Sequence, residues 1–187
     1  MMIRKEYARL INWKNKKIRK PLMVLGVRQC GKTYLIKEFG KQEFEDMAYC
    51  NFDGNKGLQS IFDYDFDINR ILEELGSIVL GKKIVPGKTL LVLDEIQDCP
   101  RAIQALKYFC ENFPELHVIA VGSLLGIALR GEGTSFPVGK VERLEMFPMS
   151  FEEFVIADGG EKYINGINKI PFKREISELY TVPMQKY

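Results

Sequence analysis

The sequence predicts an α/β fold in which a parallel sheet carries helices on both faces. Short apolar segments alternate with longer amphipathic segments, which is typical of buried parallel strands connected by helices. Hydrophobic residues make up 46% and charged residues 28% of the 187 residues, as in ordinary globular domains. This composition excludes a disordered chain, a collagen-like fibre and a small disulfide scaffold. The length leaves room for one domain with a small appendage.

Five segments have the character of strands. Most are short and apolar, and the last alternates apolar with polar residues, which predicts a less buried strand. They are residues 22–25, 47–52, 90–93, 117–121 and 141–147. Because ligands of parallel sheets bind at the carboxyl ends of the strands, we expect functional residues directly after Leu25, Leu93 and Val121.

Helices are predicted between and after these strands. They cover residues 4–13, 32–39, 67–80, a segment that Pro100 opens, and 124–130. Gly40 is expected to end the second of these helices. Ser150 and Glu153 form a capping box for a last helix that reaches Ala157. Residues 53–65 and 131–139 are expected to be loops.

Charge is unevenly distributed along the chain. The net charge of +2 gives no general attraction for nucleic acid, but residues 1–20 hold eight lysines and arginines against one glutamate. We interpret this basic segment as a solvated helix face and linker. DNA binding through it stays an open alternative.

Cysteine and histidine usage excludes the common zinc sites and indicates a cytoplasmic location. The four cysteines lie far apart without C-x-x-C spacing, and the single histidine, His117, is expected to be structural. Such scattered cysteines suit a reducing cytosol. The first residues lack the apolar core of a secretory signal, and no run of about 18 apolar residues occurs. We therefore expect neither a leader nor a membrane span.

The loop after the first strand carries the most specific motif. It matches G-x-x-x-x-G-K-[ST] with the residues Gly26, Val27, Arg28, Gln29, Cys30, Gly31, Lys32 and Thr33. Successive backbone N–H groups of such a loop, together with the positive end of the following helix, bind phosphate oxygens. Lys32 is expected to reach the β- and γ-phosphates of a nucleotide, and the Thr33 hydroxyl is expected to coordinate Mg²⁺. Within this loop we expect Arg28 to be exposed and Cys30 to act as a small hydrophobic residue.

The third strand ends in two adjacent carboxylates. Asp94 is expected to hold Mg²⁺ through water, and Glu95 to orient and polarise the attacking water as the hydrolytic base. Two acids at the rim of a buried strand are costly unless a cation offsets their charge, which favours this interpretation over a plain acidic turn. For Gln97 the alternatives are a contact with water or the next strand, and a loop role.

Three further polar residues are candidates for the site. Ser123 follows the fourth strand, where a small polar side chain can sense the γ-phosphate, cap the next helix, or do both. Arg130 and Arg143 are candidate arginine fingers, with a surface position as the alternative for each. The adenine pocket is not identified by any motif, and Tyr7, Leu10 and Ile11 are only guesses for it.

Four blocks of the sequence resemble a known family. They are residues 26–33, 90–97, 118–126, and 135–139 followed by 147–154. In order and spacing they are similar to a group of prokaryotic AAA-type P-loop ATPases, in which a C-terminal domain resembling restriction endonucleases follows the ATPase domain. The resemblance covers about residues 4–157. It implies a three-layer P-loop NTPase fold with sheet order 5-1-4-3-2, ATP and Mg²⁺ as cofactors, Ser123 as sensor and Glu95 as catalytic carboxylate.

The chain also departs from that family. Thirty residues follow Ala157, fewer than a helical lid and an endonuclease-like domain need, and Lys140 replaces the arginine of a Val-Gly-Arg block. We therefore expect an ATPase core over 1–157, with a basic N-terminal helix, and a short tail over 158–187.

Two functions follow from these observations. The first is Mg-ATP binding with hydrolysis of the β–γ bond, weakened without the lid. The second is an ATP-binding regulatory or DNA-associated module with little turnover, acting on a protein partner or a second copy. A GTPase is disfavoured because no Asn/Thr-Lys-x-Asp segment occurs. A small-molecule kinase is disfavoured because the sequence shows no second substrate pocket.

Overall fold

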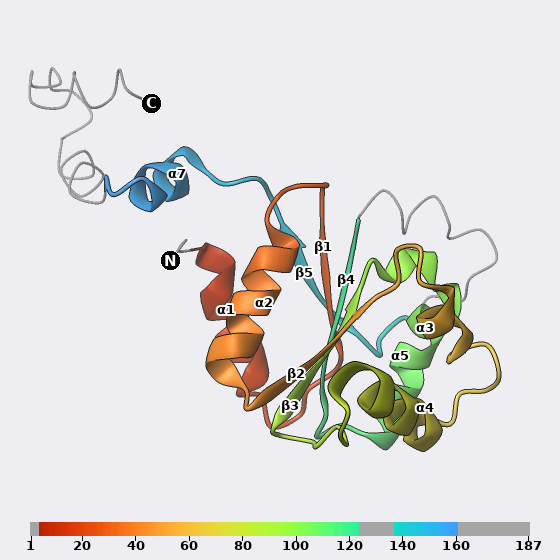
Figure 1. The fold of residues 1–187 in the computed structure, drawn as a ribbon. Helices are drawn as coiled ribbons and strands as arrows, with labels where there is room; N and C mark the ends of the chain where they lie inside the picture. Colours follow the sequence, from red (N-terminus) through yellow and green to blue (C-terminus); the bar gives the residue numbers. More distant parts are fainter. Residues whose placement is uncertain (1–3, 124–136, 161–187) are drawn as a thin grey trace, which may run out of the picture. The chain divides into compact units, whose positions relative to one another are not determined.

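The computed structural model describes residues 4–123 and 137–160 and contains a five-stranded parallel sheet (Figure 1). Its strands are β1 (Leu22–Gly26), β2 (Asp46–Asn51), β3 (Thr89–Asp94), β4 (His117–Ser123) and β5 (Glu142–Met146). They lie in the order β2-β3-β4-β1-β5, and every neighbouring pair is parallel. Both the parallel sheet and the order 5-1-4-3-2 are confirmed.

Six α-helices accompany this sheet along the described part of the chain. They are α1 (Lys5–Lys14), α2 (Lys32–Glu43), α3 (Lys56–Ser60), α4 (Ile68–Leu75), α5 (Pro100–Asn112) and α7 (Phe151–Ala157). Figure 1 shows α1 and α2 on one side of the sheet and α3, α4 and α5 on the other. The three-layer α/β architecture is therefore confirmed.

Two separate apolar cores hold the three layers together. Alternate residues of β3 point to opposite faces, so Leu91 and Leu93 join the core beneath α4 and α5, whereas Leu90 and Val92 join the core beneath α1 and α2. β1, β3 and β4 are buried along their whole length, as their continuous apolar sequences predict. The edge strand β5 buries only alternate residues, which also matches its sequence.

The chain divides into two compact units. One comprises Glu6–Pro148 and contains the whole sheet. The described part of the other comprises residues 4–5 and 149–160, with α7. The expected domain limits, 1–157 and 158–187, stay a prediction.

The predicted capping box begins α7. The Ser150 side chain accepts a hydrogen bond from the Glu153 N–H at 3.2 Å, and Glu153 accepts one from the Ser150 N–H at 2.9 Å. Burial opposes the charge of Glu153, but N–H groups of Lys5 and Ser150 and the nearby Arg4 guanidinium outweigh it and lower the pKa of this carboxyl. The interactions that fix the start of α7 thus also hold Glu153 in its charged form.

Gly40 does not end α2, contrary to the prediction. The helix continues to Glu43, and a side chain at Gly40 would place its Cβ 2.4 Å from the Met47 sulfur of β2. Gly40 therefore lies where the helix packs closely on Met47, whose side chain would have to move to admit a Cβ, and it does not form a left-handed helix end. Such a close approach depends on tertiary packing and is not visible in the local sequence.

Residues 53–80 differ in detail from the prediction. The expected loop contains α3, whose N-cap Asn55 accepts a hydrogen bond from the Leu58 N–H at 3.1 Å. The helix expected over 67–80 is α-helical only to Leu75 and continues as a π-helical turn over Gly76–Leu80. A Cβ at Gly76 would lie 2.7 Å from the Lys82 carbonyl oxygen, so the following chain packs directly on this turn.

His117 lies at the amino end of β4 and has a structural environment. Its ring packs edge-on against Trp13 and Phe44, with centroid distances of 5.7 and 4.9 Å. Burial, reinforced by the positive charge of Arg19, lowers the pKa of His117 from 6.5 to about 4. The carbonyl of Lys14, 3.4 Å from the ring, only partly opposes this shift.

This environment predicts a loss of stability in mild acid. Because the pKa of His117 is lower in the folded protein, the unfolded chain takes up a proton first as the pH falls from 6.5 to 4. The stability present above pH 6.5 should therefore decrease across this window, by about 1–2 kcal/mol after allowance for solvent screening. Urea unfolding at a series of pH values checks this for the wild type and for His117→Phe, which should lack this component. Identical pH dependences of the two proteins would contradict the assignment.

Candidate functional site

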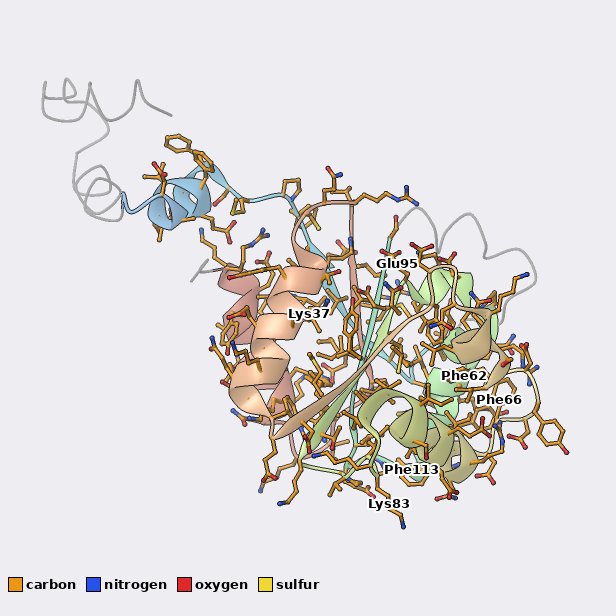
Figure 2. All side chains as sticks on the ribbon, in the orientation of Figure 1. Lys37, Phe62, Phe66, Lys83, Glu95 and Phe113 are labelled. Carbon is orange, nitrogen blue, oxygen red and sulfur yellow. The ribbon has the colours of Figure 1, made fainter. Side chains whose placement is uncertain are left out.

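The candidate residues gather at the carboxyl edge of the sheet, where the central strands β1, β3 and β4 end. Gly26 at the end of β1 pairs in register with Ser123 at the end of β4. Asp94 ends β3, the strand on the other side of β4. Figure 2 shows Glu95 at the same end of the sheet as the loop between β1 and α2.

The loop between β1 and α2 has a tightly wrapped backbone. Gln29 and Gly31 have φ values of 63° and 90°, in the left-handed region, and Gly31 leads directly into the first turn of α2. Gly26 allows a close approach, because a Cβ there would lie 2.4 Å from the Met146 carbonyl oxygen of β5. A wrapped backbone of this kind ahead of a helix can form a concavity that binds anions.

The Lys32 ammonium group is enclosed by this loop. Its Nζ donates hydrogen bonds to the carbonyl oxygens of Gly26 at 3.0 Å and Val27 at 2.8 Å, and it lies 4.0 Å from the Cys30 sulfur. Only 8% of the lysine is exposed. The first residue of α2 therefore brings a positive charge to the inner side of the loop.

Asp94 joins the loop to the acidic end of β3. The Thr33 hydroxyl donates to Asp94 Oδ2 at 3.1 Å, and the Tyr49 hydroxyl donates to the same oxygen. The Glu95 N–H donates to Asp94 Oδ1 at 2.9 Å. Asp94 is only 2% exposed, so these donors hold a buried carboxylate in place. The two sequence motifs thus meet through the contact between Thr33 and Asp94.

Tyr49 is a site residue that the sequence analysis missed. It belongs to β2, pairs in register with Val92 of β3, and lies beneath the Lys37 ammonium, 4.2 Å from its ring centroid. Burial, and then the hydrogen bond to Asp94, raise the pKa of its hydroxyl, so Tyr49 stays a donor. The sequence does show a tyrosine near the end of the second strand. Its contact with Asp94 could be predicted only by knowing that this strand lies beside β3.

A second group of contacts links Glu95, Gln97 and Ser123. Glu95 has a left-handed backbone, with φ of 50°, and its carboxylate accepts a hydrogen bond from the Gln97 side-chain Nε2. Gln97 Oε1 in turn accepts from the Ser123 N–H at 3.3 Å. For Gln97, the structure therefore selects the contact with the next strand.

Of the two candidate arginines, the structure describes Arg143 alone, and it does not place Arg143 in this cluster. Arg143 is exposed on β5 and pairs with Met23, three residues before the carboxyl edge of β1. Arg130 lies outside the described residues, as does the helix expected over 124–130. Arg28 is exposed and Cys30 is buried, as expected for both. Lys140 forms an ion pair with Glu111 at 2.8 Å.

The structure lends no support to Tyr7, Leu10 and Ile11 as an adenine pocket, and that assignment stays a prediction. Leu10 is fully buried in the core beneath α1 and α2, where Ile11 also packs. The Tyr7 hydroxyl donates to Gln42 at 2.9 Å, near the end of α2 opposite the phosphate loop. At 1.5 Å per residue this is about 15 Å from Lys32 along the helix. The apolar stripe of α1 therefore builds the core.

The basic segment 1–20 is partly neutralised by carboxylates from other segments of the chain. Four of its cations form ion pairs with carboxylates: Arg4 with Glu153, Lys5 with Glu152, Lys14 with Glu43 and Lys16 with Glu142. Arg19 donates to backbone carbonyl oxygens, including that of Glu115 at 3.0 Å. These contacts favour the interpretation as a helix face and linker over a DNA-binding segment.

Solved structures similar to this chain include one of DnaA and two of Pif1. AMPPCP-bound DnaA from Aquifex aeolicus is 14% identical with a TM-score of 0.42, over 96% of this chain and 53% of that one. A Pif1 helicase from a structure of DNA unwinding at forked duplex DNA is 16% identical with a TM-score of 0.47, over 100% and 52%. Unliganded Pif1 from Bacteroides sp. is 17% identical with a TM-score of 0.40, over 91% and 47%. The chain spans about half the length of these proteins.

Comparisons at the level of sequence identify the family. No curated protein sequence matches the chain significantly. Within residues 4–123 and 137–160, no helix has the length and hydropathy needed to cross a bilayer. The profile of the AAA domain family matches residues 18–155, which include the whole sheet and the cluster at its carboxyl edge. The chain therefore belongs to the AAA domain family of ATP-binding P-loop ATPases.

Proposed function

We propose that this domain binds ATP with Mg²⁺ at the carboxyl edge of its sheet and hydrolyses the bond between the β- and γ-phosphates. The observation that carries the proposal is the 3.1 Å contact between Thr33 and Asp94. This contact brings together a loop suited to phosphate and a strand end suited to a cation and a water molecule. The contact joins two motifs whose residues Thr33 and Asp94 are 61 positions apart in the sequence, which supports a single site.

The residues fit both cofactors. The wrapped loop and the enclosed Lys32 ammonium offer hydrogen-bond donors and positive charge to phosphate. Thr33 and Asp94 offer a hydroxyl and a carboxylate oxygen, the hard ligands that Mg²⁺ takes alongside water and phosphate oxygens. Mg²⁺ bound there supplies neutralisation of phosphate charge.

Each side chain has a distinct role in this proposal. Lys32 exchanges the neutral carbonyl oxygens of Gly26 and Val27 for negatively charged phosphate oxygens, which strengthens its hydrogen bonds. Glu95 orients the attacking water and accepts its proton. Ser123 places a small polar group beside the γ-phosphate. Tyr49 keeps the Asp94 carboxylate oriented.

An ATP-binding module with little turnover is the second candidate. The observation that favours it is the position of Arg143, which pairs with Met23, three residues before the end of β1, and so offers no arginine finger to the cluster. In this alternative ATP binding itself is the signal, and the partner is a protein, a second copy or DNA.

Phosphate release from labelled ATP tests the proposal and separates the two candidates. The purified chain should bind ATP and release phosphate with Mg²⁺ present, and release should stop when EDTA removes the metal. Binding without release over many hours would support the second candidate. Absence of ATP binding would overturn both.

Thr33 provides a specific test of the proposed metal position. Thr33→Ala removes the hydroxyl, so the Mg²⁺ concentration that gives half-maximal hydrolysis should rise about tenfold or more. Thr33→Ser keeps the hydroxyl and should stay near the wild type, which makes it the matched control. Magnesium titrations of ATP hydrolysis measure both variants. Equal magnesium dependence of Thr33→Ala and wild type would remove Thr33 from the metal site.

A further inference from the structure

We propose that Gln97 is a positioning residue that ties the Glu95 carboxylate to the end of β4, so that the base and the candidate sensor Ser123 keep a fixed relation. The inference rests on the proposed function, because Glu95 and Ser123 have their roles only within that proposal. Gln97 itself touches neither phosphate nor metal in this account. It acts through Glu95.

The geometry of Gln97 carries this inference. Its side-chain Nε2 donates to Glu95, two residues earlier, and its Oε1 accepts from the backbone N–H of Ser123 on the neighbouring strand at 3.3 Å. One side chain therefore contacts two of the three elements that form the site. Gln97 is only 5% exposed and Ser123 only 9%, so bulk water does not readily replace either bond.

The amide group suits this position chemically. A primary amide offers a donor at one atom and an acceptor at the other, so it can face a carboxylate and a backbone N–H at the same time. A glutamate in its place keeps the acceptor but turns a negative charge toward Glu95. A methionine has a similar length and keeps neither strong hydrogen bond. The two substitutions therefore separate the two halves of the bridge.

The backbone of Glu95 gives a second reason for a tether. Glu95 adopts a left-handed conformation, which is uncommon for a residue with a side chain, and a short 3₁₀ turn over Ile96–Asp98 follows it. The turn brings Gln97 back toward the carboxylate. A purely structural alternative is that Gln97 only stabilises this turn, and the experiment must distinguish the two.

Amide hydrogen exchange tests the bridge in the full chain without nucleotide. In Gln97→Met the Ser123 N–H loses its acceptor, so its exchange should accelerate about tenfold or more, whereas the Val121 N–H within β4 should not change. Gln97→Glu should leave Ser123 protected, because the acceptor stays. Gln104→Met on α5 is the matched control and should alter neither amide. Unchanged exchange of Ser123 in Gln97→Met would overturn the bridge.

A double-mutant cycle tests the action through Glu95. Gln97→Met should lower kcat about 10- to 100-fold while the dissociation constant for ATP stays within about twofold. In a Glu95→Gln background the same substitution should change the residual rate less than about twofold, because its target is already lost. Gln97→Glu should lower kcat at least as much as Gln97→Met, although Ser123 stays protected. If Gln97→Met prevents folding, the same double-mutant cycle with Glu95→Gln is measured with Gln97→Glu instead.

The outcomes separate the inference from the proposed function. Equal losses from Gln97→Met in the wild-type and Glu95→Gln backgrounds would overturn the inference and favour the purely structural role. If Glu95→Gln abolishes phosphate release but Gln97→Met leaves it unchanged, the inference is overturned and the proposed function stands. A wild type without phosphate release would overturn the proposed hydrolysis, and the exchange rates would then still decide whether Gln97 ties Ser123 in place.

Discussion

Glu95→Gln should bind ATP as the wild type does but hydrolyse it about 10²- to 10⁴-fold more slowly, the range typical of a lost general base. The substitution keeps the size of the side chain and removes the charge that orients and deprotonates water. The Glu95 side chain makes neither of the hydrogen bonds that connect this strand end to the phosphate loop: the Glu95 N–H donates to Asp94, and Thr33 donates to Asp94. The loop itself should therefore not change. Equilibrium ATP binding and steady-state phosphate release, measured on the same preparation, check the two halves of this expectation.

The control for this variant is another glutamate-to-glutamine change. Glu145→Gln removes an exposed carboxylate of β5 and should alter neither binding nor turnover. Turnover by Glu95→Gln equal to that of the wild type would remove Glu95 from its role. A loss of ATP binding in this variant would show instead that Glu95 supports the fold of the site.

Lys32→Ala should lower the affinity for ATP about 100-fold. Two charge-assisted hydrogen bonds are lost, and a combined contribution of about 3 kcal/mol corresponds to that factor. The substitution also leaves the carbonyl groups of Gly26 and Val27 without their present donor, which weakens the loop itself. Isothermal titration of ATP in the presence of Mg²⁺ measures the effect.

Two further variants keep this prediction interpretable. Lys41→Ala removes an exposed lysine from the last turn of the same helix and should bind ATP normally. Lys32→Met keeps the aliphatic stem and separates loss of charge from loss of packing. Equal affinities of the wild type and Lys32→Ala would contradict the proposed phosphate site, provided that both proteins melt cooperatively.

The sequence was informative for several features whose determining interactions are local, although the short helix α3, with its local cap Asn55, was missed. The apolar residues of β1 and β3 define buried strands without reference to their neighbours, and the motif that ends in Lys32 and Thr33 is a contiguous loop. The box of Ser150 and Glu153 is equally local and is confirmed. The sheet order, by contrast, came from the family resemblance and not from these patterns.

What the sequence did not reveal depends on contacts between distant segments. Gly40 has the appearance of a helix stop, but α2 continues past it and packs at this point against Met47 of β2. Leu10 lies on an apolar stripe that fits either a pocket or the core, and only the packing of α1 against the sheet decides between them. Tyr49 reaches Asp94 only because β2 lies beside β3.

The central claim is that the loop after β1 and the acid-ended β3 form a single site for ATP and magnesium. The most direct test is a crystal structure of the full chain with a non-hydrolysable ATP analogue and Mg²⁺. The claim predicts phosphates on the backbone N–H groups of the loop, Lys32 turned from the carbonyls of Gly26 and Val27 toward them, and the metal about 2.1 Å from the Thr33 hydroxyl. A nucleotide bound elsewhere, with Lys32 still on those carbonyls, would contradict it.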